Sequence, residues 1–318
     1  MSRKNFILVG AILLVIGGVL LSLRQKPLVE EPILSSVPEE NIPEPSEQPM
    51  RVRVTNSVSS FVELPPVEQS VQIITAGTDY EQRIRAAVYD LPENMGTQHS
   101  RELQTYLLTP QNGKDGDFRQ HEYALRNYIM DALREQTDRL PETITTFVDV
   151  YENEQQGDVM RGYALQHLCS VYIDNARDLP SSEKERILNV FTEALKDTSG
   201  GTLAGTALIG LHEAARSDAD FVSGKTVEAA AQQLLQSPDA GTLSKISAFQ
   251  ICGERNVAAV APAARKTALD ESADWVLRMS AVYALGQFGQ TDGLEHLLDD
   301  NDSNVSHAAR MALKKTQR

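Results

Sequence analysis

The chain has 318 residues, enough for two ordinary domains or for one elongated repeat array. Hydrophobic residues make up 41% of it but aromatic residues only 6%, so Ala and Leu supply most of the apolar content. This composition favours closely packed helices over a β-sandwich. The net charge is −14; residues 1–74 carry 6 Lys and Arg against 8 Asp and Glu, which leaves a net of −12 for residues 75–318. We therefore expect no nucleic-acid partner, because such a charge repels phosphate.

The N-terminus predicts a membrane anchor. After a tail over residues 1–5, residues 6–23 form an uncharged run of 18 residues, close to the shortest length that spans a bilayer. A cleaved secretory signal is the alternative, but Arg24 and Lys26 follow where a small-residue cleavage site would be expected. The sequence thus predicts a single-pass membrane protein with its soluble domain on the extracytoplasmic, periplasmic side.

Residues 24–74 are expected to separate the anchor from the folded domain. Between Pro27 and Pro49 this segment holds six prolines and six glutamates, a composition typical of an extended spacer. Residues 51–74 alternate only partly between apolar and polar, and SVQIIT over 70–75 could form a short strand.

From residue 75 to 318 the pattern becomes helical. Thr78 and Glu81 are spaced as a capping box that would open the first helix. Gly253, Gly286 and Gly289 lie where later helices are expected to end.

Six stretches of this region align on one alanine, with spacings of 40, 43, 41, 33 and 28 residues. The aligned alanines are Ala124, Ala164, Ala207, Ala248, Ala281 and Ala309. Four positions after each stands a larger residue on the same helix face: Tyr128, Leu168, Leu211, Cys252, Leu285 and Leu313. Amphipathic segments lie between these stretches, so the sequence predicts an all-α fold, an α-solenoid of about six helical pairs.

The last two units resemble a known family. Residues 276–289 (VLRMSAVYALGQFG) and 297–305 (LLDDNDSNV) resemble the HEAT repeat, in particular the short repeats of phycobilisome-lyase-type proteins, over residues 274–315. Arg278 keeps the basic position of this pattern, whereas Ser306 replaces it in the last unit. The resemblance implies a scaffold or adaptor.

Patterns for phosphate and zinc are incomplete. Residues 223–226 (SGKT) end like a phosphate-binding loop, but the glycine that this loop needs at position 219 is Ala219. His212 and Glu213 begin like a zinc-protease helix, but Arg216 stands where the second histidine would be. His167 and His212 lie within the repeat helices and are expected to help pack them.

An acidic segment and two cysteines are the remaining candidates for a site. Residues 299–304 hold several Asp and Asn but lack the glycine and the distal glutamate of a calcium loop, and Asp302 is expected to cap the next helix. Cys169 and Cys252 lie in apolar helical runs and are expected to be buried, although a disulfide between them is possible. The sequence therefore predicts no catalytic residue, no metal site and no cofactor.

The leading hypothesis is a non-catalytic, membrane-anchored scaffold or adaptor that binds a protein partner through its repeat surface. The alternative is a lyase-like enzyme or accessory factor that handles a prosthetic group, which a cysteine thiol could hold. A DNA-binding, glycosylase-like array would need a basic groove, which the net charge of −12 disfavours.

Overall fold

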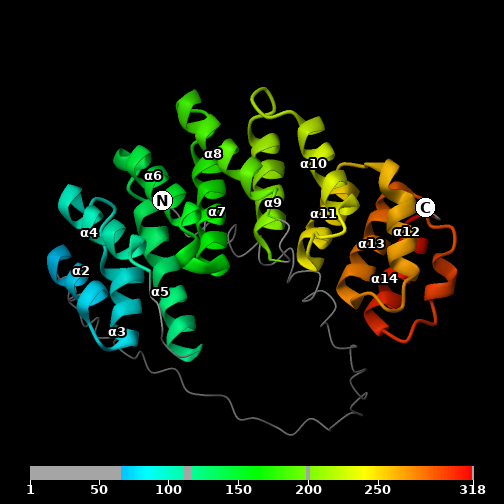
Figure 1. Cartoon of the computed structure of the whole chain (residues 1–318), viewed down its shortest axis with the longest axis horizontal. Coiled ribbons are helices and arrows are strands. Elements are labelled where there is room, and N and C mark those ends of the chain that lie inside the picture. The colour runs from blue at the N-terminus through cyan, green and yellow to red at the C-terminus, as the bar shows by residue number, and fades with distance from the viewer. Residues whose placement is uncertain (1–65, 111–115, 198–200, 317–318) are drawn as a thin grey trace, which may run out of the picture. The chain divides into compact units, whose positions relative to one another are not determined.

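The structure is a computed structural model that describes residues 66–110, 116–197 and 201–316. Within these ranges the chain is all-α, without strands, and its helices follow one another in chain order (Figure 1). The first helices are α2 (Val67–Ala76), α3 (Tyr80–Arg85), α4 (Gly96–Leu108), α5 (Gly116–Arg134), α6 (Leu140–Glu152), α7 (Gly157–Asp174) and α8 (Ser181–Ala194). The later ones are α9 (Leu203–Ser217), α10 (Gly224–Gln236), α11 (Thr242–Glu254), α12 (Ala261–Leu269), α13 (Trp275–Phe288), the 3-10 helix η5 (Leu294–Leu297) and α14 (Ser303–Thr316).

The helices pack in pairs, as the sequence predicted. The pairs are α4 with α5, α6 with α7, α8 with α9, α10 with α11, α12 with α13, and η5 with α14. The second helix of each pair also packs on the second helix of the next, from α5 through α7, α9, α11 and α13 to α14. Each pair thus buries its apolar residues mainly against its neighbours, which is the organisation of a helical-repeat array. An additional pair, α2 with α3, precedes the six aligned units.

The aligned alanines mark the second helices. Each of the six lies in one of these helices, and all but Ala124 are fully buried. Their larger partners four residues later are buried as well, except for Tyr128 and Leu313, which are half-buried. The spacing of a small and a large apolar residue therefore identified the packed face of each second helix correctly.

Two of the glycines that were expected to end helices have another role. Gly289 does end α13, with a positive φ of 69°. Gly253 and Gly286 instead lie inside α11 and α13. A Cβ at Gly253 would lie 3.3 Å from Cα of Ala284, and one at Gly286 would lie 2.9 Å from Cβ of Ala312. These two glycines allow neighbouring second helices to approach closely.

The start of the folded region differs from the prediction. The segment SVQIIT over 70–75 is part of helix α2 rather than a strand, and the first helix among the described residues begins at Val67, ahead of residue 75. Val71 and Ile74 are fully buried, and their spacing of three suits a helix. Asp79, not Thr78, caps α3, since its side chain accepts a hydrogen bond of 3.1 Å from the Gln82 amide.

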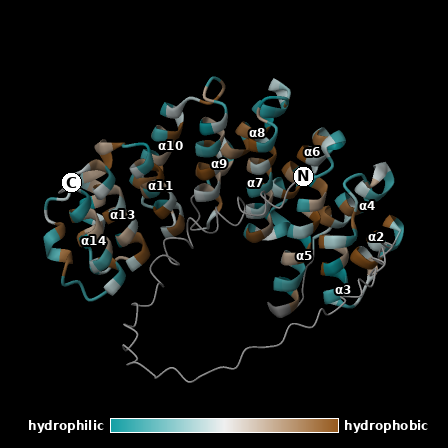
Figure 2. Ribbon diagram, turned by 180° about the vertical axis from the view of Figure 1, so that it is seen from behind, coloured by the Kyte–Doolittle hydropathy of each residue, from teal (hydrophilic) through white to brown (hydrophobic). Residues whose placement is uncertain are grey.

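The predicted localisation as a single-pass membrane protein is wrong. None of the helices that the structure describes is both long enough and apolar enough to cross a membrane. Figure 2 shows the reason, because these helices combine hydrophobic with hydrophilic residues along their length. The proposed anchor over 6–23 and the spacer at the start of 24–74 lie outside the described residues.

Arginine side chains connect first and second helices. In three pairs, an arginine at the start of the second helix donates its Nε–H to a backbone carbonyl near the end of the first. These bonds run from Arg83 to Ile74 at 2.8 Å, from Arg161 to Tyr151 at 2.8 Å, and from Arg278 to Ala268 at 3.1 Å. They satisfy carbonyls that the helix end leaves without a partner. Arg161 and Arg278 occupy the same position relative to the aligned alanine, and we call this bond the arginine clamp.

Arg278 also forms a buried ion pair. Its guanidinium binds both carboxylate oxygens of Asp300, and the two side chains are only 6% and 7% exposed. Burial alone would raise the pKa of Asp300, but hydrogen bonds from Arg278 and from the Asp302 amide outweigh it and hold that pKa below its usual value. The pair joins α13 to the segment before α14.

Replacing Gly286 with Ala should destabilise the protein, although alanine is the better helix former. We expect a loss of about 1–3 kcal/mol in the free energy of unfolding, because the added methyl group overlaps Ala312. Urea denaturation measures it. The double variant Gly286→Ala/Ala312→Gly should recover most of the loss, and equal losses for the single and the double variant would contradict this explanation.

Breaking the buried ion pair should cost more than breaking an exposed one. Arg278→Met leaves the Asp300 carboxylate buried without its partner, and we expect a loss of about 3–5 kcal/mol in urea denaturation. Lys196→Met is the matched control, because Lys196 pairs with Glu193 in an exposed position and should cost no more than about 1 kcal/mol.

The pair also makes stability depend on pH. Because the pKa of Asp300 is lower in the folded than in the unfolded chain, its contribution is complete above the unfolded pKa and is lost as the pH falls through the folded pKa. In acid, Asp300→Asn should therefore unfold with a weaker pH dependence than the parent chain. Parallel pH profiles for the two proteins would rule this out.

Candidate binding surface

Helices α7, α9, α11 and α13 each leave only one narrow stripe exposed. In α9, the residues that are not buried are Thr206, Ile209, Glu213, Arg216 and Ser217, and every other residue of the helix is buried. A spacing of three and four residues places these side chains on one side of the helix. The other sides are covered by the paired helix α8 and by the neighbouring helices α7 and α11.

The same stripe recurs along the array. Counted from the aligned alanine, it falls at positions −5, −1, +2 and +6. The side chains at these positions that are half-buried or exposed are Val159, Tyr163 and Gln166 on α7, Leu243, Gln250 and Glu254 on α11, Val276, Tyr283 and Gln287 on α13, and Asn304, Ala308, Met311 and Lys315 on α14. Because the second helices pack side by side, their stripes adjoin. We call this surface, with Thr206, Ile209 and Glu213 of α9, the second-helix face.

Apolar side chains are concentrated on this face. Seven large apolar side chains of the described residues are exposed, and four of them belong to the face. They are Val159, Leu243, Tyr283 and Met311, which are 46%, 49%, 38% and 54% exposed. Exposed apolar groups gathered on one surface are typical of a protein interface.

Carboxylates lie near the C-terminal ends of successive second helices. Asp174, Glu213 and Glu254 extend from α7, α9 and α11, and their side chains are between 27% and 44% exposed. Asp131 of α5 continues the series, and Arg134 binds both it and Asp174, at 3.1 and 3.3 Å. The carboxylates are thus held on successive helices at a partly solvated surface.

Two buried histidines lie beside this row of carboxylates. Nε2 of His212 lies 3.0 Å from a carboxylate oxygen of Glu254, and this hydrogen bond is the main reason why the pKa of Glu254 is lowered. Nε2 of His167 lies 3.0 Å from the side-chain oxygen of Asn127. Burial, aided by the charge of Arg134, lowers the pKa of His167 to about 3, so this ring stays neutral. Both histidines lie in repeat helices and pack there, as the sequence indicated.

The two cysteines are free and buried. They lie in different second helices, Cys169 in α7 and Cys252 in α11. Burial raises the pKa of each thiol to about 12, with nearby carboxylates such as Glu213 and Glu228 adding to the effect. Since the thiolate is the reactive form, neither side chain is prepared for nucleophilic chemistry.

The other patterns singled out in the sequence have structural roles. Gly224 of the SGKT segment is covered by Arg255, because a Cβ there would lie 1.8 Å from its guanidinium. Asp302 caps α14 by accepting hydrogen bonds from the amides of Asn304 and Val305, at 2.8 and 3.3 Å. No group of three or more His, Cys, Asp or Glu side chains within the described ranges could hold a metal ion.

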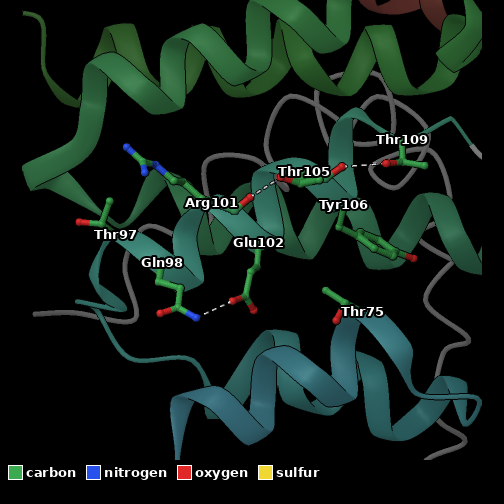
Figure 3. A pocket seen from close by; sticks show the side chains of 8 residues that line it. All are labelled: Thr75, Thr97, Gln98, Arg101, Glu102, Thr105, Tyr106 and Thr109. Atoms are coloured by element: carbon green, nitrogen blue, oxygen red, sulfur yellow. Dashed lines mark hydrogen bonds between the residues drawn. The ribbon is translucent and has the colours of Figure 1, made fainter.

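A separate open groove lies between the first helices α2 and α4, with a volume of about 690 Å³ (Figure 3). Threonines line much of it, but the hydroxyl groups of Thr75, Thr105 and Thr109 donate to backbone carbonyls of their own helices. Gln98 donates to Glu102 at 3.1 Å. These internal bonds leave few polar groups free to converge on a ligand, so the groove is a weaker candidate than the second-helix face.

The HEAT repeats family model matches residues 227–314, which extend from α10 to α14. With the paired helices and the clamp of Arg278, this match shows that residues 227–314 form HEAT repeats. It does not confirm the phycobilisome-lyase type. No curated protein sequence matches the chain.

Two solved structures resemble this chain, with low sequence identity and low TM-scores. Human deoxyhypusine hydroxylase in complex with glycerol is 15% identical, with 79% of this chain and 96% of that chain covered and a TM-score of 0.33. An engineered protein is 18% identical, with 80% and 97% covered and a TM-score of 0.32. Nothing about the chemistry of this chain follows from these likenesses.

The second-helix face was not identified from the sequence, although the signal was present. Counting two and six residues beyond each aligned alanine finds Ile209 and Glu213, and equally Gln250 and Glu254. The aligned alanines by themselves mark the buried side of each helix. The opposite side follows from the same alignment by helical geometry.

Both thiols should react slowly in the folded protein. Because Cys169 and Cys252 are buried and their pKa values lie near 12, we expect a thiol-labelling reagent at pH 8 to modify neither until the chain is unfolded. Labelling in guanidinium chloride supplies the full signal for comparison. Rapid modification of either cysteine under native conditions would revive a thiol-based lyase-like function.

Proposed function

We propose that the chain is a non-catalytic scaffold or adaptor that binds a protein partner through the second-helix face. The observation that carries this proposal is that four of the seven exposed large apolar side chains of the described residues lie on the second-helix face. These side chains lie outside the buried core, and each exposes apolar area to water that a partner could cover: Val159, Leu243, Tyr283 and Met311.

The surroundings of these side chains support a protein rather than a small molecule as the ligand. The stripes of α7, α9, α11, α13 and α14 form an extended surface, whereas small-molecule sites are concave and enclose most of their ligand. Amide side chains such as Gln166 and Gln250 lie among the apolar ones and can hydrogen-bond to a partner's backbone. HEAT-repeat arrays are also compatible with a scaffold or adaptor role.

Photo-crosslinking tests the proposal. A benzoyl-phenylalanine placed at Gln250 or at Met311, both on the face, should yield the same cross-linked protein in cells that produce the full chain. The same group at Gln233, an exposed position on the first helix α10, is the control and should not yield it. Mass spectrometry identifies the adduct.

Two outcomes contradict the proposal. The face positions and Gln233 could give the same pattern of adducts, which would mean that the face has no special affinity. Alternatively, the adducts could contain only a second copy of this chain, in which case the face is a self-association surface.

A further inference from the structure

We infer that the partner segment recognised by the second-helix face is extended and basic, with Lys or Arg at about every third residue and apolar residues between them. This inference rests on the proposed function and adds the chemistry and the spacing of the partner. Three independent features of the face support it: the charge of its C-terminal row, the distance between its helices, and the apolar side chains beside that row.

The row of carboxylates carries an excess of negative charge. Asp131, Asp174, Glu213 and Glu254 extend from four successive second helices, and two guanidinium groups lie among them. Arg134 already binds Asp131 and Asp174, and Arg216 lies 3.2 Å from Glu213. Four carboxylates against two guanidinium groups leave an excess of two negative charges in this row, so a cationic partner gains both attraction and a faster encounter.

Glu213 and Glu254 are the carboxylates best placed to receive such a cation. Glu213 is only paired with the exposed Arg216 of its own helix, an arrangement worth little in water. Glu254 accepts a hydrogen bond from His212 on one oxygen, and its lowered pKa shows that the charged form is favoured. Both carboxylates are partly exposed, so a cation of a partner can reach them.

The spacing of the helices sets the spacing of the partner's charges. Helices packed in direct contact lie about 8–10 Å apart. A chain extended as a polyproline II helix has three residues per turn and advances about 3.1 Å per residue, so every third side chain points the same way and lies about 9 Å further along, one helix on. A segment that crosses α7, α9 and α11 therefore meets Asp174, Glu213 and Glu254 with every third side chain.

Apolar groups beside the row account for the residues in between. Ile209 is half-buried one turn before Glu213 on α9, and Tyr283 is exposed on α13, the helix next to α11. Beyond Tyr283 the charge reverses, since Lys315 of α14 donates to Gln287 and lies at the position that Glu213 and Glu254 occupy on their helices. A basic segment is thus attracted to α7, α9 and α11 and not to α14.

The test uses purified full chain and labelled peptides of about 12 residues, long enough to pass four helices. The probe is built of repeated Leu-Ser-Lys triplets, and two matched peptides carry Glu or Gln in place of Lys. Fluorescence anisotropy should show binding of the Lys peptide, weakened by salt, and at least about tenfold weaker binding of the other two.

Charge reversal on the protein provides the matched comparison. The variant Glu213→Lys/Glu254→Lys should weaken binding of the Lys peptide at least about tenfold. Glu142→Lys/Glu185→Lys changes the net charge equally but lies on the exposed surface of the first helices α6 and α8, and it should weaken binding much less. Glu213→Gln/Glu254→Gln should give an intermediate loss, which separates lost attraction from added repulsion, and circular dichroism checks that each variant is folded.

Several results would overturn the inference. One is no binding of the Lys peptide up to about 1 mM, and another is an equal loss in the two charge-reversed variants. If the Gln peptide binds as tightly as the Lys peptide, and Leu243→Ser/Tyr283→Ser abolishes both, then the face binds apolar segments without regard to charge. In that case the inference fails while the proposed function stands, whereas crosslinking without face-specific adducts would defeat the proposed function itself.

Discussion

Close contact between the second helices is the constraint on which the rest of this structure depends. It is made possible by small residues at the contacts, as where a Cβ added to Gly205 would lie 3.0 Å from Cα of Ser244. The backbone amide of Gly205 also donates a hydrogen bond of 3.1 Å to the Ser244 hydroxyl, which joins the two helices at this contact. With glycine, alanine and serine at such positions, α7, α9, α11 and α13 are covered on both flanks by neighbouring second helices and at the back by the paired helix. Larger residues there would separate the helices and leave gaps in the core.

This packing determines where function can reside. A helix covered on three sides keeps a single stripe free, and only residues on that stripe can change without disturbing the core. The stripes of this chain hold amides, carboxylates and exposed apolar groups, whereas the residues beside them, such as His167 and His212, are buried and neutral or hydrogen-bonded. The arrangement separates the residues that hold the array together from those that meet a partner.

Much of the fold could be predicted from the sequence because a small residue and a large one, four positions apart, recur where second helices pack. The glycines were harder to interpret, since both a left-handed helix end and a close helix contact require the absence of a Cβ. Gly289 is the first case and Gly286 the second, although they lie three residues apart. Helix α2 was missed because its valine and isoleucine residues favour a strand locally, and packing against the rest of the array overrides that preference. The exposed stripe also follows from the aligned alanines by helical geometry, but which of its positions are apolar and exposed depends on packing between helices that are far apart in the sequence.

The arginine clamp is unevenly distributed, and this has a mechanical consequence. Arg161 and Arg278 provide it, Lys245 makes a longer bond of 3.4 Å to the Pro238 carbonyl, and Ala204 and Ser306 stand at the same position in α9 and α14. A side chain as short as alanine cannot bridge the two helices of its pair. In an array stabilised by contacts between neighbours, the pairs without this bond open at the lowest cost. Under tension the chain should therefore lengthen in steps, yielding first at the pairs of α9 and α14 while the clamped pairs keep their shape.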